Sequence, residues 1–302
     1  IRLHLLTFRN GFFSNLLWEQ ISLPILARYM SVDVTISPAN YGPILAPSTI
    51  IMLRNSLAVA SKETRPIKRL YWGGLALMTG LSLLTCRRAI AVSEYARQAL
   101  TFKLGKKLQN KIDVIHHGVS ENFKPSRNTA KEKFLLAVSD IYVQKNLHTM
   151  ALALVNIRKE YPDIILKIAG KPVDLGYLKE LNYVLEKNGL TDCIEFLGEQ
   201  NDKELLMLYQ NCLLFVFPST VETFGNPLVE AMSCGAPIVC SNTSVMPEIM
   251  GDAGRYFDPL NVSDIAETVI SLLSDEIARK NLSLKAIQRS KRFSWLGTAK
   301  KT

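Results

Sequence analysis

Two glutamates, Glu222 and Glu230, stand eight positions apart in the stretch 218–242, which reads PSTVETFGNPLVEAMSCGAPIVCSN. Asn226 is a favourable N-cap residue and Pro227 suits the first position of a helix, so a helix is expected to begin there. Glu230 would then lie in the first turn and Glu222 in the loop before it. Carboxylates accept hydrogen bonds from hydroxyls, and the unpaired amides at a helix N-terminus bind anions. The pattern therefore indicates a site for a ligand that carries hydroxyls and phosphates.

The backbone of this loop supports the same interpretation. Gly225 allows the chain to approach a ligand closely, and the amides of Gly225, Asn226 and Leu228 are expected to point out of the turn. Each carboxylate alone has an ordinary alternative, because Glu230 would complement a helix dipole and Glu222 would lie in a solvated loop. The two glutamates indicate a ligand site only when the complete stretch 218–242 is considered.

The elements around this stretch predict an α/β fold. Short apolar runs without alternation are typical of strands buried on both faces of a sheet. In the second half the expected strands are 134–139, 164–169, 193–197, 213–217, 237–240 and 255–257, and the expected helices are 146–160, 174–188, 202–210, 227–234 and 262–273. Strands that alternate with helices in this way form a parallel, doubly wound sheet, whose ligands bind beyond the carboxyl ends of the strands.

The first half repeats this scheme in a shorter form. Its expected strands are 32–36, 49–53, 89–92 and 112–115, and its expected helices are 14–30, 66–85 and 94–103. The segment 119–132 is polar and contains Pro125, so it is predicted to link a domain at 1–118 to a domain at 133–302.

The net charge of +9 is concentrated in the first half of the 302 residues. Residues 1–118 hold 15 Lys and Arg against 5 Asp and Glu, whereas residues 119–302 hold 21 against 22. The asymmetry indicates an anionic membrane surface or an anionic acceptor as partner, with a basic solvated face as the alternative. Nucleic acid is not expected, because the basic half has no stripe of interleaved aromatic and basic residues.

An apolar stretch at 70–86 holds 17 uncharged residues between two basic groups. These are Arg65, Lys68 and Arg69 before the stretch and Arg87 and Arg88 after it. A membrane-spanning helix needs about 20 apolar residues, so a buried or interfacial helix is expected instead. Basic flanks suit a helix that lies on an anionic membrane surface.

Other chemistries lack their motifs. The sequence has no GxxxxGK[ST], GxGxxG, HExxH or GxSxG pattern. Five scattered cysteines without a CxxC pair suggest a reducing compartment, and we expect a cytoplasmic protein, peripheral on the inner face of the cell membrane. No metal-ligand cluster is visible, so neither a metal nor another cofactor is expected. For His116 and His117, a structural or substrate-lining role is favoured over that of a general base.

The stretch 218–242 resembles the C-terminal signature of the family 4, or group 1, glycosyltransferases, whose usual run is PSxxExFGxPxxEAMAxGxPVxxSN. Ser233 and Ile238 replace the usual Ala and Val. The likeness continues through MPEIMGDAGRYFDP, IEFLGEQ, LKIAGKP and VSDIYVQKNL, and in the first half through WEQISLPILA, AVSEYAR and VIHHGV. The resemblance implies the GT-B fold, in which two Rossmann-like doubly wound domains face each other across a cleft. The C-terminal domain would bind a nucleotide-sugar and the N-terminal domain an acceptor.

The resemblance also implies a reaction and its residues. A hexosyl group would pass with retention, and without an essential metal, from a UDP- or GDP-linked sugar to a glycan or lipid-linked acceptor. Glu222 and Lys145 would be catalytic, with Lys145 neutralising the diphosphate that leaves, and Glu230 would bind the ribose. The other residues expected at the donor are Phe224, Gly225, Asn226, Leu228, Ser139 and Gly170.

The sequence departs from the family pattern at several places. Asp140 and Gln144 stand where the family has a second phosphate-binding cation, and Arg54 and Asn55 stand where it often has a His-Asp pair. The opening strand with its glycine-rich loop and the final crossover helix are expected to be missing, which would leave the N-terminal domain incomplete. These departures keep a second hypothesis open, a catalytically impaired relative that binds nucleotide or serves as a scaffold.

Overall fold

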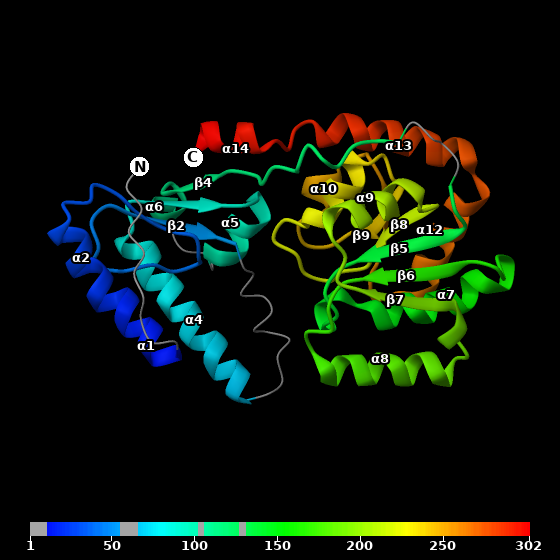
Figure 1. Cartoon of the computed structure of the whole chain (residues 1–302), viewed down its shortest axis with the longest axis horizontal. Coiled ribbons are helices and arrows are strands. Elements are labelled where there is room, and N and C mark those ends of the chain that lie inside the picture. The colour runs from blue at the N-terminus through cyan, green and yellow to red at the C-terminus, as the bar shows by residue number, and fades with distance from the viewer. Residues whose placement is uncertain (1–10, 55–65, 102–105, 127–130) are drawn as a thin grey trace. The chain divides into compact units, whose positions relative to one another are not determined.

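The computed structural model describes residues 11–54, 66–101, 106–126 and 131–302. The chain divides into two compact units, Ile1–Ile115 and His116–Thr302. Each unit is built on one parallel sheet with helices packed against it (Figure 1). Within the described ranges, no helix combines the length and the apolar character that a membrane crossing requires.

The sheet of the first unit has four parallel strands in sequential order. They are β1 (Thr35–Ser37), β2 (Thr49–Leu53), β3 (Arg88–Ala91) and β4 (Ile112–Val114). The predicted strands that correspond to β2, β3 and β4 are confirmed to within one residue. Strand β1 begins three residues later than expected, because the turn that ends the preceding helix is longer. Ser31 in this turn has a φ of 52°, and the Val32 amide still donates to the carbonyl of Ala27.

The helices of the first unit follow the prediction with two exceptions, an additional short helix and a π-helical turn. Helix α4 (Pro66–Thr85) matches the expected helix 66–85, and α5 (Glu94–Thr101) begins where predicted. A short helix, α6 (Lys106–Gln109), was not predicted. The expected helix 14–30 is present as a continuous run, but a π-helical turn, η1 (Trp18–Ser22), separates α1 (Phe12–Leu17) from α2 (Leu23–Tyr29). Residues 55 and 65, which the sequence singled out, lie outside the described ranges.

The sheet of the second unit has six parallel strands in the order β10-β9-β8-β5-β6-β7. The strands are β5 (Phe134–Val138), β6 (Ile165–Ala169), β7 (Ile194–Gly198), β8 (Leu214–Phe217), β9 (Ile238–Ser241) and β10 (Arg255–Phe257). All six predicted strands are confirmed, and the order is that of a doubly wound Rossmann sheet. Every residue of β5, β8 and β9 is buried, as their uninterrupted apolar runs predicted.

Helices cover both faces of this sheet, as a doubly wound fold requires (Figure 1). The five predicted helices are present as α7 (Leu147–Glu160), α8 (Leu175–Lys187), α9 (Asp202–Asn211), α10 (Asn226–Ser233) and α12 (Val262–Ser274). Side chains cap the N-termini of α8, α9 and α12. At α9, for example, Asn201 accepts from the amides of Lys203 and Glu204, at 3.0 and 3.1 Å.

Three helices were not predicted: α11 (Met246–Met250), α13 (Glu276–Ser290) and α14 (Trp295–Lys301). Helix α13 buries only Leu282, Ala286 and Ser290, a stripe one residue wide, while its apolar Ile277 and Leu284 are exposed. Such a stripe is too thin for a periodicity argument, although it is sufficient to pack α13 against α10.

The described part of the expected linker 119–132 belongs to the second unit. Val119 forms a parallel bridge with Ser294, and the buried ring of Phe123 meets that of Tyr209 at 5.9 Å. The segment is polar in composition, but the backbone bridge of Val119 and the burial of Phe123 tie it to the second unit.

Candidate active site

The centre of the second sheet is its topological switch point. Strands β5 and β8 are neighbours there, and from them the strand order runs outward in opposite directions. Ligands of doubly wound sheets bind beyond the carboxyl ends of the strands at this point. The residue after β5 is Ser139 and the residue after β8 is Pro218, so both of the loops that the sequence singled out begin here.

Lys145 and Glu222 form an ion pair between these two loops. Lys145 Nζ lies 2.5 Å from Glu222 Oε1, and the two side chains are only 9% and 14% exposed. The ammonium also lies over the rings of Tyr142 and Phe217, at 5.3 and 5.6 Å. Burial by itself lowers the pKa of Lys145, but Glu222 and Tyr142 outweigh it and raise the pKa overall, so the group remains charged. The fold thus joins the two residues predicted to be catalytic, 77 positions apart.

Asn146 holds the two loops together. Its side-chain amide donates to the carbonyls of Pro218 and Pro259, at 3.2 and 2.7 Å, and its Oδ1 accepts from Thr149 Oγ1 at 2.6 Å. Asn146 is buried and has a φ of 55°, a conformation that asparagine tolerates better than most residues. The sequence analysis did not single it out, although an Asn directly after Lys145 was available as a signal.

The main chain of Glu222 is held by Ser244, which the sequence analysis also missed. The Glu222 amide donates to Ser244 Oγ at 2.8 Å, and Ser244 Oγ donates to the Glu222 carbonyl at 2.7 Å. Ser244 lies in the turn after β9 and has a φ of 58°. The loops after the neighbouring strands β5, β8 and β9 therefore together position Glu222.

The start of α10 differs from the prediction in two respects. The helix begins at Asn226, with Gly225 as N-cap at a φ of 80°, so Glu230 lies in the second turn and not in the first. The Leu228 amide donates to the Gly225 carbonyl at 2.9 Å, so it does not point outward as expected. The left-handed conformation of Gly225 is the cause, because it turns that carbonyl back over the first helical turn. Phe224 is buried beside this turn.

Glu230 is paired with a tyrosine that the sequence analysis missed. Tyr209, in α9, is fully buried, and its hydroxyl donates to Glu230 Oε2 at 2.9 Å. Burial raises the pKa of Glu230, and the bond from Tyr209 partly offsets this effect. A carboxylate offers about four acceptor positions, so a single hydroxyl donor leaves capacity for a ligand.

Ser139 and Gly170 are joined by backbone packing. A Cβ atom at Gly170 would lie 2.0 Å from the Ser139 carbonyl oxygen, and the φ of Gly170 is +150°. The Gly170 amide donates to the Gly198 carbonyl at 2.8 Å. The turns after β5 and β6 therefore touch at Gly170, and a glycine is required there for packing whatever its contact with a donor.

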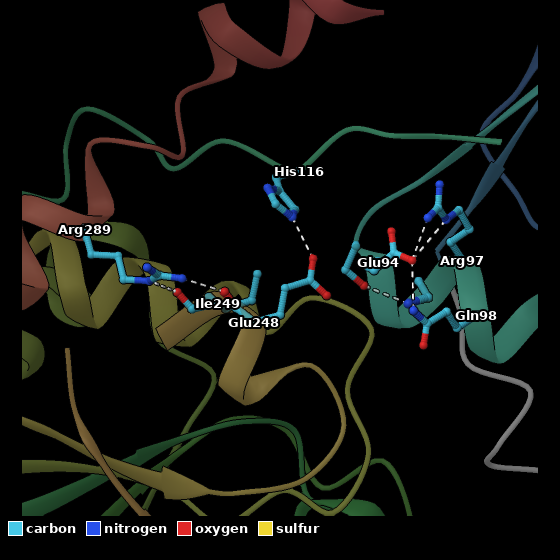
Figure 2. A network of polar contacts seen from close by, with 9 residues as sticks. Glu94, Arg97, Gln98, His116, Glu248, Ile249 and Arg289 are labelled. Carbon is cyan, nitrogen blue, oxygen red and sulfur yellow. Dashed lines mark hydrogen bonds and ion pairs between the residues drawn. The ribbon is translucent and has the colours of Figure 1, made fainter. Parts of the chain in front are cut away.

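Two histidines begin the second unit. His116 Nε2 lies 2.9 Å from Glu248 Oε1, and the two side chains point toward one another in Figure 2. Arg289 donates to the carbonyls of Glu248 and Ile249 and so neutralises the carboxyl end of α11. His117 Nδ1 lies 3.2 Å from Asn226 Oδ1, so the histidine contacts the first residue of α10.

The ring of His117 is held by aromatic contacts. It stacks on Trp295, with 5.7 Å between ring centroids, and lies 4.9 Å from Phe224. Trp295 of the unpredicted helix α14 and Asn226 of α10 thus both contact His117, and its structural or substrate-lining role stays a prediction.

The two positions that lack the family's cation serve as structural supports. Asp140 Oδ1 accepts from the amide of Lys171 at 3.1 Å, and the carbonyl of the buried Gln144 accepts from the Thr220 amide at 2.9 Å. In the part of the chain that the structure describes, no three His, Cys, Asp or Glu side chains gather in a way that could hold a metal ion.

Solved structures of other proteins are similar to this fold. The Anabaena protein Alr3699/HepE, solved in complex with UDP and glucose, has a TM-score of 0.71 at 21% identity over 84% of this chain and 70% of its own. WaaG, a glycosyltransferase involved in lipopolysaccharide biosynthesis, has a TM-score of 0.74 at 15% identity over 92% and 79%. These likenesses confirm the predicted α/β fold of the GT-B class.

Sequence comparison identifies relatives. O-antigen chain mannosyltransferase B of Escherichia coli is 33% identical over 170 residues, 55% of this chain and 43% of that protein. Serotype-specific mannosyltransferase WbdA of the same species is 34% identical over 174 residues, 56% and 21%. The chain thus spans less than half the length of either relative. The family model described as "Glycosyl transferases group 1" matches residues 119–289, and the chain belongs to this family.

Proposed function

We propose that this protein transfers a hexosyl group from a nucleoside-diphosphate sugar to a glycan or lipid-linked acceptor, with retention at the anomeric carbon. The observation that carries the proposal is the buried Lys145–Glu222 pair at the switch point of the second sheet. Membership of the group 1 glycosyl transferases and the mannosyltransferase relatives support it.

In the proposed reaction the diphosphate is the leaving group, and its developing charge needs a positioned cation. Lys145 supplies it, because an ammonium has three donors and can serve Glu222 and a phosphate oxygen together. Glu222 fixes the ammonium beside the donor sugar, and Glu230 accepts hydrogen bonds from the ribose hydroxyls. With the reactants held in this way, the attack of the acceptor hydroxyl on the same face requires positioning more than a protein nucleophile.

The test is detection of transfer by mass spectrometry with a panel of UDP- and GDP-linked hexoses. Mannose donors come first, because the two Escherichia coli relatives are mannosyltransferases. We expect an acceptor to gain one hexosyl unit from one donor of the panel. Nucleotide binding without transfer from any donor would contradict the proposal and favour the catalytically impaired relative.

We expect Glu230→Ala to weaken nucleotide binding by about 10- to 150-fold, because charge-assisted hydrogen bonds are each worth about 1.5–3 kcal/mol. Tyr209→Phe is the matched control, since it keeps the carboxylate and removes only the bond at 2.9 Å that orients it. Its loss of affinity is expected to be smaller. Calorimetry on the folded variants measures both, and unchanged affinity in Glu230→Ala would show that the ribose binds elsewhere.

We further propose that the first unit docks on an anionic membrane, which would bring a lipid-linked acceptor within reach. Two helical segments of this unit expose large apolar side chains. On the run from α1 to α2 they are Leu17, Ile21, Ile25 and Tyr29, and on α4 they are Leu70, Leu77, Leu81 and Leu84. Arg69 and Arg87, at the two ends of the apolar stretch of α4, are exposed as well. Exposed apolar rows with basic flanks suit a lipid surface.

Vesicle sedimentation is expected to show binding that requires anionic lipid and falls steeply as salt rises. A juxtamembrane cation contributes about 1 kcal/mol, and the attraction fades over about 8 Å at physiological salt. Charge reversal at Arg65, Lys68 and Arg69 should abolish binding, whereas the same reversal at the exposed Lys291, Lys300 and Lys301 of the second unit should not. Binding that ignores lipid charge would point to a purely apolar anchor, and no binding would favour a soluble acceptor.

A further inference from the structure

The π-helical turn η1 is an irregularity that the sequence analysis did not foresee. The Leu23 amide donates to the carbonyl of Trp18, five residues back, instead of four. Pro24 follows directly as the second residue of α2 and has no amide hydrogen, so it donates no bond to the preceding turn. π-Helical turns are rare, and those that do occur inside α-helices are often found at functional sites.

This turn forms one wall of a pocket of about 270 Å³ in the first unit. The opposite wall is strand β1 with the loop after it. The lining residues are Asn15, Trp18, Glu19 and Leu23 from the helical run and Thr35, Ile36, Ser37, Pro38 and Pro43 from the other wall. Binding pockets for drug-sized ligands run from about 300 to 1,000 Å³, so this one suits a single ring.

Two polar groups of this pocket lack a protein partner within the described ranges. Thr35 Oγ1 is buried and makes no hydrogen bond, which is unfavourable unless a ligand supplies the partner. Glu19, half-buried in the turn, forms no ion pair with any described residue. Its burial raises the pKa of the carboxyl. A carboxylate and an unpartnered hydroxyl thus belong to residues on facing walls of one pocket.

The lining chemistry selects among ligands. It contains one acidic side chain and no basic one, which disfavours phosphates and other anions. Glu19 and Thr35 together accept and donate hydrogen bonds, as sugar hydroxyls require. The indole of Trp18 and the side chains of Leu23 and Ile36 offer apolar surface for the C–H groups of a sugar ring.

We propose that this pocket is a saccharide subsite, in which Glu19 and Thr35 bind hydroxyls of one sugar ring and Trp18 covers its apolar face. The inference rests on the proposed function only in taking that ring to be the terminal sugar of the acceptor. Binding itself needs neither donor nor turnover. Sugar binding in the pocket can therefore be tested even if no transfer is observed.

The test is NMR of the three tryptophan indole N–H signals, assigned by Trp→Phe substitution, while methyl α-mannoside, methyl α-glucoside or methyl β-galactoside is added without nucleotide. We expect one of these sugars to shift the signal of Trp18 and to leave those of Trp72 and Trp295 in place. Methylammonium chloride is the counter-probe. A shift with the amine and not with any sugar would make the pocket a cation site and overturn the proposal.

Two nearly isosteric variants separate binding from folding. Glu19→Gln should weaken sugar binding by about tenfold or more, because it loses charge-assisted hydrogen bonds. Thr35→Val should weaken binding too, yet it should leave the melting temperature unchanged or raised, since it removes a buried hydroxyl that lacks a partner. Thr85→Val on α4 is the control, because Thr85 Oγ1 bonds only within its own helix. Wild-type sugar affinity in both pocket variants, or no shift with any sugar, would refute the subsite.

Discussion

Lys145→Ala is expected to lower the free energy of unfolding by about 3–5 kcal/mol, the usual cost of removing one partner from a buried ion pair. The carboxylate of Glu222, which is 14% exposed, would be left without its cation. The double variant Lys145→Met, Glu222→Gln removes both charges together and should recover most of this loss. Urea denaturation measures all three proteins. A loss well below 1 kcal/mol for Lys145→Ala would show that water can replace the ammonium beside Glu222 at little cost in stability.

The same variants separate stability from ligand binding. If Lys145 faces the diphosphate, UDP or GDP should bind the double variant far more weakly than it binds the wild type, although the fold is restored. The parent nucleoside should bind both proteins alike, because it shares the base and the ribose but carries no phosphate. Equal losses for nucleoside and diphosphate would contradict the role proposed for Lys145 and make the pair a purely structural link between the loops after β5 and β8.

Gly170→Ala is expected to prevent stable folding of the second unit, a loss above about 4 kcal/mol. The added Cβ would lie 2.0 Å from the carbonyl oxygen of Ser139, a backbone atom that a side-chain rotation cannot move. Gly189→Ala is the matched control, because Gly189 also has a positive φ, +64°, but has no atom within 4 Å of the added Cβ. That control should lose only about 1–2 kcal/mol.

The measurement is chemical denaturation with the circular dichroism of the helices as the signal. If the two glycine variants lose the same free energy, the turns after β5 and β6 can move apart, and Gly170 would not be required for their packing. Ser139 would then be free to shift relative to the donor, and its expected contact with a nucleotide-sugar would lose support.

The sequence by itself determined the strands of the second unit and most of its helices. Strands such as β5 and β8 are buried on both faces, so their residues form short, unbroken apolar runs. In an amphipathic helix the apolar residues instead recur at intervals along a longer segment, which distinguishes the two patterns. The same signal identified the loop that holds Glu222 and the helix that holds Glu230. The pattern failed for α13, where three buried residues are too few to define a period.

Only the tertiary structure decided which side chains meet at the site. Lys145 and Glu222 come from loops 77 positions apart, and the crossing at the switch point joins them. Tyr209 and Ser244 support the site through bonds to residues more than 20 positions away, so no local spacing reveals them. Asn146 stands next to Lys145, but its bond to the Pro259 carbonyl, 113 positions away, is visible only in the structure. The start of α10 depended on one backbone torsion, that of Gly225.

The difference has a physical reason. The periodicity of burial can be read from the sequence, because the side chains of a strand or a helix face the core at a fixed interval along the chain. Contacts between strand ends are set by the order of strands in the sheet, β8 beside β5 and not beside β7. That order follows from packing of the whole unit, which no short stretch of sequence encodes.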